Sequence, residues 1–349
     1  MSKHFTRVVL LGTAGGPGLF EDQRSCGIST AVVYGESVYL VDLGAGAMAS
    51  LNRSGVAASS GAPDAAGALL DNVRGIFFTH LHSDHVADWP TLYATAPPNS
   101  IRRTDPIRVF GPGPRAQLPR LFPPTRPDVE PINPADPSLG IAGMTATLRN
   151  AFAADLNDRI RDTNMADPAS RFEISEIDLA GTWDVDAAGV PPRLTRPLDV
   201  WVDGDVKVTA TLVDHRPTAP AFAYRFDTPD GSIVVSGDTT VSPNLIALAE
   251  GADCLVHEVI DPMFVQDITS QLPGEIAAAT REHLLASHTT IEQVGRDVAQ
   301  PAGVKQLVLS HLVPPSGPES RWKNAGRGFD GKVVVGRDLM QFGIGTRKR

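Results

Sequence analysis

The chain lacks a long apolar run and has few cysteines. No apolar stretch reaches the roughly 18 residues of a transmembrane helix, and the N-terminal segment has too short an apolar core for a signal peptide. Its two cysteines, Cys26 and Cys254, lie far apart in the sequence, so we expect two buried thiols, with a disulfide as the alternative. These absences predict a cytoplasmic protein with no membrane partner.

Basic residues are in the minority. There are 31 Lys and Arg against 40 Asp and Glu, which gives a formal net charge of −9. Broad binding to nucleic-acid backbones depends on clustered basic residues, so this balance argues against it. One local cluster can form either a basic groove or a solvated loop face. Its members are Arg102, Arg103, Arg108, Arg115, Arg120 and Arg126.

Residues 79–88, THLHSDHVAD, contain three histidines and an aspartate in the pattern H-x-H-x-D-H. They follow an apolar run at residues 73–78, so we expect them in the turn at the carboxyl end of a strand. Neutral imidazoles and carboxylates are the ligands that a divalent ion such as zinc prefers. The pattern therefore predicts a metal site rather than a histidine-rich surface turn. The side chains concerned are His80, His82, Asp84 and His85.

Three other strand-like runs each end in a further candidate ligand. His215 follows the run at 208–213, and two more runs end just before Asp238 and His311. A single histidine or aspartate after a strand is usually a cap or turn residue. Three of them, together with the motif at 79–88, favour a site for two metal ions.

Strand-like segments dominate both ends of the chain, and helical segments occur in each half. This order predicts an α+β fold of αββα type, with two mixed β-sheets flanked by helices. We expect one domain over residues 1–349, with an insertion at about 97–204 that begins as a Pro-rich loop and forms either a lid or an oligomer contact. Its large apolar side chains either contact substrate or pack the insertion's own core: Phe152, Phe172 and Trp183. Residues 332–335 and 338–343 suggest a final hairpin.

The glycine-rich stretch at residues 12–18 does not fit a nucleotide-binding fingerprint. It lacks the GK[ST] ending of a phosphate loop, and its G-x-x-G-G order differs from the dinucleotide motif. We expect it to form a loop near the metal site.

Together these motifs resemble the metallo-β-lactamase superfamily, and most closely the branch that holds ribonuclease Z and the arylsulfatase-type hydrolases. The resemblance covers about residues 7–95 and 205–345. It is carried by H-x-H-x-D-H and by an aspartate after an early strand. The later phrases are D-H-R with A-Y-R-F, G-D-T, V-H-E-V, H-T-T-I-E and S-H, and the residues that define them include Asp42, His215, Asp238, Glu258, His288 and His311.

The resemblance implies two divalent metal ions, expected to be zinc, although the same residue types also suit manganese and iron. One ion would be held by His80, His82 and His215. The second would be held by Asp84, His85 and His311, with Asp238 bridging the two. A hydroxide between the ions would be the nucleophile.

Other side chains would support this centre. Asp42 and Glu258 are candidates to hold the imidazoles in place. Asp84 and His288 are the candidate catalytic residues. His288 would assist the leaving oxygen, or would alternatively be a histidine at a helix N-terminus or one paired with another side chain. We expect His257 to pack in the core and His283 to be an ordinary helix or surface residue.

We therefore expect a metal-dependent hydrolase of a small-molecule ester, first a sulfate or phosphate ester and then a carboxylic ester or lactone. In ribonuclease Z a long arm that grips tRNA separates the third-ligand histidine from the bridging aspartate. Here His215 and Asp238 are 23 residues apart, which leaves no room for that arm. The net charge and the missing arm make nucleic acid the less favoured substrate.

Two alternatives are kept. One is a ribonuclease Z-like endonuclease or phosphodiesterase that acts on RNA or cyclic nucleotides. The other is a binding protein with a vestigial site, which a missing ligand would signal; no ligand is missing from the motifs. The resemblance also suggests a homodimer.

Overall fold

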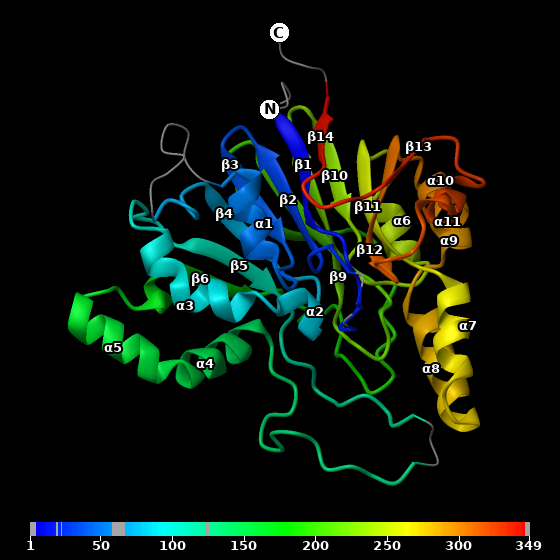
Figure 1. Ribbon diagram of the computed structural model, residues 1–349, viewed down its shortest axis with the longest axis horizontal. Coiled ribbons are helices and arrows are strands. Elements are labelled where there is room, and N and C mark those ends of the chain that lie inside the picture. Colours follow the sequence, from blue (N-terminus) through cyan, green and yellow to red (C-terminus); the bar gives the residue numbers. More distant parts are fainter. Residues whose placement is uncertain (1–4, 19, 22, 58–66, 123–125, 346–349) are drawn as a thin grey trace.

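The computed structural model describes residues 5–18, 20–21, 23–57, 67–122 and 126–345. Two mixed sheets of seven strands pack face to face, with helices on the outer face of each (Figure 1). This is the α+β sandwich that the sequence predicts. Within the described ranges, no helix is long and apolar enough to cross a membrane.

The strands divide into two sheets. The first sheet has the order β14-β1-β2-β3-β4-β5-β6 and the second β13-β12-β11-β10-β9-β8-β7. The first consists of β1 (Thr6–Gly12), β2 (Ser29–Tyr34), β3 (Ser37–Val41), β4 (Val73–Phe77), β5 (Ile107–Gly111), β6 (Phe172–Glu176) and β14 (Gln341–Ile344). The second consists of β7 (Leu198–Asp203), β8 (Val206–Leu212), β9 (Phe222–Thr228), β10 (Gly231–Val235), β11 (Cys254–Ile260), β12 (Gln306–Val313) and β13 (Lys332–Val335).

The helices lie between these strands along the chain. They are α1 (Ala47–Ser54), α2 (Ser83–Val86), α3 (Trp89–Asn99), α4 (Ile141–Ala151), α5 (Ala153–Thr163), α6 (Pro243–Leu248), α7 (Pro262–Ser270), α8 (Gly274–Ser287), α9 (Ile291–Gln293), α10 (Gln300–Ala302) and α11 (Glu319–Trp322). The pairs α4–α5 and α7–α8 extend away from the sheets on opposite sides of the molecule (Figure 1). Residues 112–122, which follow β5, run along the lower end of the molecule toward α8 (Figure 1).

The sheets are buried on both faces because successive residues of a strand point to opposite sides. In β1, Val8 and Leu10 belong to the core between the sheets, whereas Val9 and Leu11 pack under the helices of the first sheet. All four side chains are fully buried. Strands buried on both faces read as continuous apolar runs, which explains why they were evident in the sequence.

The strand directions place the candidate ligands at one end of the sandwich. β3 is parallel to β4, and β10, β11 and β12 are parallel to one another. β8 and β10 are both antiparallel to β9, so β8 ends at the same edge as β10. The turns that follow these strands therefore lie together, at the carboxyl ends where α/β sheets usually build sites.

The predicted C-terminal hairpin is wrong. β13 pairs in parallel with β12 of the second sheet, and β14 pairs antiparallel with β1 of the first. Their short separation resembles a hairpin loop, but each strand instead extends an open edge of a different sheet. A second difference is that β12 continues past the predicted end at Leu309 to Val313, with His311 at a positive φ of 43°.

The limits of the predicted insertion at 97–204 stay a prediction. Within it, β5 and β6 extend the first sheet, and β7 forms an edge of the second. Phe172 packs against Trp89 and Tyr93, with ring centroids 5.0 and 5.5 Å apart. Trp183 packs against the core between the sheets, and Phe152 is half-buried where α4 meets α5. Phe172 and Trp183 therefore pack in the structure, but against the cores of the sandwich and not in a separate core of the insertion.

Candidate metal centre

The structure brings all seven predicted ligand side chains together at the strand ends. Three groups of side chains have donor atoms within 4.8 Å of one another. They are His80, His82, His215 and Asp238; Asp84, His85 and His311; and Asp238, His288 and His311. The first two groups correspond to the two ion sites that the sequence resemblance implied, and the ligand roles themselves stay a proposal.

Asp238 lies at the middle of the cluster, in the turn after β10, and is 2% exposed. Its Oδ2 is 3.3 Å from Nε2 of both His85 and His311. It is 3.9 Å from Nε2 of His80 and 3.8 Å from Nε2 of His215. Burial raises the pKa of Asp238, but the imidazoles of His311 and His85 lower it well below its usual range. A carboxylate surrounded in this way can bridge two cations.

Asp42 fixes the imidazoles contributed by the first sheet. It follows β3 at a positive φ of 57°. Its Oδ1 accepts a hydrogen bond from the Thr79 backbone (2.8 Å), and Oδ2 accepts from the Thr79 hydroxyl (2.8 Å) and from Nδ1 of His85 (2.9 Å). Because the Thr79 hydroxyl donates to Asp42, its oxygen accepts from Nδ1 of His80 (3.1 Å). Both histidines then carry a proton on Nδ1 and direct Nε2 toward the centre.

His215 and His82 are held by a backbone carbonyl and a hydroxyl instead of by Asp42. Nδ1 of His215 donates to the Ser287 carbonyl (2.9 Å), which leaves Nε2 for the centre. His82 uses Nε2 to contact the Thr218 hydroxyl (2.6 Å), so its Nδ1 faces inward, 3.3 Å from Nε2 of His215. Burial lowers the pKa of His80, His82 and His215, which keeps these imidazoles neutral, the form that binds metals.

Several buried polar atoms in the cluster have no hydrogen-bond partner among the described residues. They are Nε2 of His80, Nε2 of His85, Oδ1 of Asp238 and Nδ1 of His311. Leaving a buried polar atom unpaired costs about 1–3 kcal/mol, so several in one place call for a further binding partner. Imidazole nitrogens and carboxylate oxygens together suit a divalent cation, and the residues therefore fit the metals that the fold implies.

The glycine-rich loop at 12–18 lies beside the centre, as the sequence suggested. The Gly16 backbone donates to Oδ2 of Asp84 (3.0 Å). A Cβ at Gly15 would come within 2.4 Å of Nδ1 of His311, so only glycine fits at this close approach. The loop therefore packs against Asp84 and His311, two members of the second group of candidate ligands.

His288 forms a buried ion pair next to the cluster, between α8 and α9. Its Nδ1 is 3.1 Å from Oε1 of Glu258 and 3.9 Å from Oδ2 of Asp238. Oε1 of Glu258 also accepts from the backbone of Thr239 (3.1 Å) and Thr289 (3.0 Å). Burial lowers the pKa of His288, but the Glu258 carboxylate and its hydrogen bond raise it more, to about 9. A protonated imidazole in this position can donate a proton.

The two other histidines among the described residues differ from each other. His257 is fully buried in β11, and its Nδ1 contacts the Glu258 carbonyl (2.6 Å), which confirms its predicted place in the core. His283 lies on α8 and lines a cavity, a position that the sequence did not indicate.

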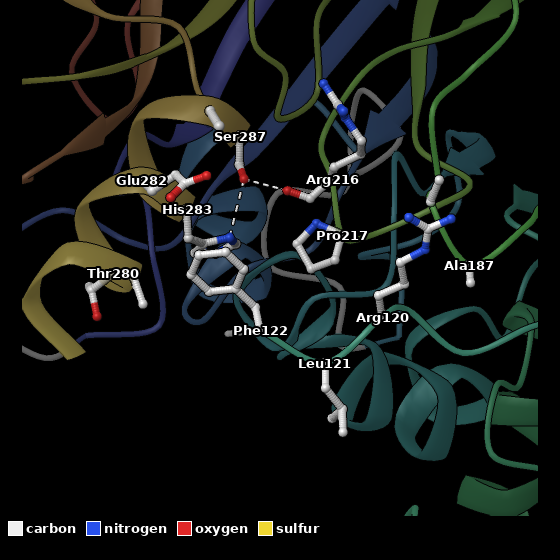
Figure 2. Close-up of a pocket in the computed structure, with 13 residues that line it drawn as sticks. Arg120, Leu121, Phe122, Ala187, Arg216, Pro217, Thr280, Glu282, His283 and Ser287 are labelled. Atoms are coloured by element: carbon white, nitrogen blue, oxygen red, sulfur yellow. Dashed lines mark hydrogen bonds between the residues drawn. The ribbon is translucent and has the colours of Figure 1, made fainter. Parts of the chain in front are cut away.

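This cavity, of about 610 Å³, lies beside α8 and is shown with its lining residues in Figure 2. Its walls are one face of α8, residues 120–122, residues 187–188, and Arg216 with Pro217. It adjoins the candidate ligands, because Arg216 follows His215 and the Ser287 carbonyl accepts the His215 hydrogen bond. Sequence reasoning missed the cavity because its walls come from four distant segments without a shared motif.

The predicted basic cluster at 102–126 does not form one groove in the described structure. Arg103 donates to backbone carbonyls at residues 70, 71 and 73, and Arg108 pairs with Glu173. Arg115 donates to the carbonyls of residues 186 and 217. Arg120 lines the cavity beside α8. Arg103 and Arg115 therefore hold loops of the fold, and Arg108 pairs with a residue of the neighbouring strand β6.

Comparisons with known proteins agree with this arrangement. Residues 25–283 match the model of the Metallo-beta-lactamase superfamily. Ribonuclease Z of Mycobacterium sp. (strain KMS) is 29% identical over 335 residues, which cover 95% of this chain and 94% of that protein. Two solved structures share the fold. The short form of human tRNase Z is 16% identical, with a TM-score of 0.58 and coverage of 97% and 99%. The metallo-beta-lactamase fold protein YhfI of Bacillus subtilis is 17% identical, with a TM-score of 0.56 and coverage of 97% and 98%.

Proposed function

The chain belongs to the metallo-β-lactamase superfamily and is a metal-dependent hydrolase, and from this premise we propose that it cleaves phosphodiester bonds in RNA. The similarity to ribonuclease Z over nearly the full length of both chains carries this proposal. It reverses the order expected from the sequence, which placed a small-molecule ester first and nucleic acid second. The curated relative reported above is named for a ribonuclease, not for an arylsulfatase.

The proposed site uses the seven predicted side chains. His80, His82 and His215 would hold one divalent ion. Asp84, His85 and His311 would hold the second, and Asp238 would contact both. When bound, such ions supply Lewis acids that stabilise charge on a phosphoryl group and make water nucleophilic near neutral pH.

The chain's own residues would orient the imidazole ligands and supply a proton to the leaving oxygen. Asp42 and Thr79 keep the proton on Nδ1 of the imidazoles that they contact. Glu258 holds Nδ1 of His288 and favours its protonated form. His288 would then give a proton to the oxygen that leaves, the role that the sequence suggested for it. With no arm between His215 and Asp238, substrate contacts would be confined to the centre and its surroundings.

A small-molecule ester is the second candidate, because a specific observation favours it. The cavity beside the centre has about 610 Å³, within the range of about 300–1,000 Å³ typical of small-ligand pockets. It is lined mainly by small and apolar side chains. A ligand of drug size could bind within this cavity alone, whereas a folded RNA would need a wider contact surface.

A comparison of substrates tests the proposal. The zinc-loaded protein would be given a tRNA precursor with a 3′ extension, an aryl sulfate and an aryl carboxylic ester. We expect cleavage of the RNA, and we expect an excess of unlabelled RNA to compete with it. Turnover of the sulfate or carboxylic ester without cleavage of RNA would reject the proposal in favour of the second candidate. Asp158→Ala, an exposed change on α5, is the matched control for substitutions at the centre.

A further inference from the structure

We infer that the cavity beside α8 binds the nucleobase attached to the scissile phosphodiester, and this inference rests on the proposed function. A base taken out of its stack needs an apolar slot with an aromatic surface. The cavity offers both features next to the candidate ligands.

One wall of the cavity is a single face of α8. Ala279, His283 and Ala286 recur at helical spacing along that face, and Ser287 ends it. Ala286 is exposed, and the small alanine side chains leave the space open. Figure 2 shows His283 pointing from the helix into this space.

The opposite wall supplies an aromatic ring and a positive charge. Phe122 lines the cavity and is 47% exposed, so part of its ring surface is accessible to a ligand. Arg120 lies on the far side of the cavity from α8 (Figure 2). Its guanidinium makes no hydrogen bond or ion pair with the residues that the structure describes, so it is available for an anionic group such as a phosphate.

Two other charged side chains line the cavity, one positive and one negative. Arg216 is bound by both oxygens of Asp214, at 2.8 and 2.9 Å. Glu282 on α8 is the carboxylate among the lining residues. Because the cavity carries charges of both signs, it suits a neutral ring joined to one phosphate better than a polyanion. This agrees with a site for one unstacked base and not with a groove for the nucleic-acid backbone.

The cavity lies close enough to the centre for a base bound in it to position the attached phosphate there. Ser287 connects its end to the centre, because the Ser287 carbonyl accepts from His215 and its hydroxyl donates to the Arg216 carbonyl. A ring held against Phe122 and His283 would therefore place the phosphate attached to it toward His215. This would make Phe122, His283 and Ala286 determinants of specificity.

The test compares two probes that differ only in the base. Adenosine 5′-monophosphate and ribose 5-phosphate would be titrated into the zinc-loaded protein by calorimetry. We expect the nucleotide to bind at least about fivefold more tightly, the lower end of what stacking of one base provides. Ala286→Trp, which fills the cavity, and Phe122→Ala, which removes the ring, should each abolish most of that difference.

The control is Ala278→Trp, the same change at another exposed position of α8 that does not line the cavity. It should keep the preference of the unmodified protein. Equal binding of both probes, or a preference that survives Ala286→Trp, would overturn the inference even if the protein cleaves RNA. A preference for the nucleotide in a protein that cleaves no RNA would reject only the proposed function.

Discussion

Oδ2 of Asp42 lies 2.9 Å from Nδ1 of His85, and both side chains are buried. This contact joins the end of β3 to the motif that follows β4. It presents Nε2 of His85 to Asp238, at 3.3 Å from Oδ2. One carboxylate that binds no metal itself thus orients a proposed ligand from a neighbouring strand.

Asp42→Asn should weaken metal binding. The amide cannot accept all three hydrogen bonds that the carboxylate accepts, so His85 would lose the partner that fixes its tautomer. We expect a 10- to 100-fold lower affinity for zinc, measured by competition with a chelator. Asp230→Asn, at a half-buried aspartate in the turn at the opposite end of β10, is the control and should leave the affinity unchanged. An unaltered affinity in Asp42→Asn would contradict this role.

His288→Ala should lower turnover while the metal content stays the same. If the imidazole donates a proton to the leaving oxygen, its loss should reduce kcat by about 10²- to 10⁴-fold. Metal per chain is measured in the same samples by elemental analysis. Loss of metal together with activity would instead make His288 a ligand, an arrangement that its proximity to Asp238 and His311 also allows.

Asp203→Asn should destabilise the protein at neutral pH more than at acid pH. Asp203 on β7 accepts from Arg74 of β4 at 3.0 Å and from the Tyr39 hydroxyl of β3 at 2.9 Å, so it ties the two sheets together. The Arg74 hydrogen bond lowers the pKa of Asp203. A carboxyl whose pKa is lower in the folded state stabilises the fold above its unfolded pKa of about 3.9, and this contribution is lost as the pH falls through the folded value.

We expect a loss of about 1–2 kcal/mol in unfolding free energy at pH 7, by denaturant titration, and a smaller difference at pH 3. Asp199→Asn on the same strand is the control, because Asp199 is exposed and should change stability much less. Equal effects of the two substitutions would show that Asp203 does not tie the sheets.

The two cysteines should react separately. Both are free; Cys254 is buried and Cys26 is half-buried, so the expectation of two buried thiols describes Cys254 only. Burial raises the pKa of the Cys254 thiol to about 12, which keeps it protonated and unreactive. A thiol reagent at pH 8 should label one cysteine in the native protein and two after unfolding. Rapid labelling of both in the native state would contradict the buried position of Cys254.

The candidate ligands could be predicted because each one is a local signal. His80 to His85 form a dense motif directly after an apolar strand, and His215 and Asp238 each follow another. Parallel strand ends meet at one edge, so the structure brings these residues together. The fold class followed from the same continuous apolar strands.

The features that sequence reasoning missed depend on contacts between distant segments. Phe122 and Ala286 come to line one cavity only through the packing of a loop against α8. The true partners of β13 and β14 depend on which sheet edge is open, which a short spacing cannot reveal. Phe172 gave no sign of packing on Trp89 and Tyr93, since apolar side chains suit both a pocket and a core.

The most direct test of the account measures metal content and RNA cleavage together in the unmodified protein and in Asp238→Ala. We predict two divalent ions per chain and cleavage of RNA in the unmodified protein. In the variant we predict fewer ions and a loss of activity of at least about 100-fold, more than the loss of an outer hydrogen-bond partner causes. A protein that binds no metal, or a variant that keeps both ions and activity, would contradict the account.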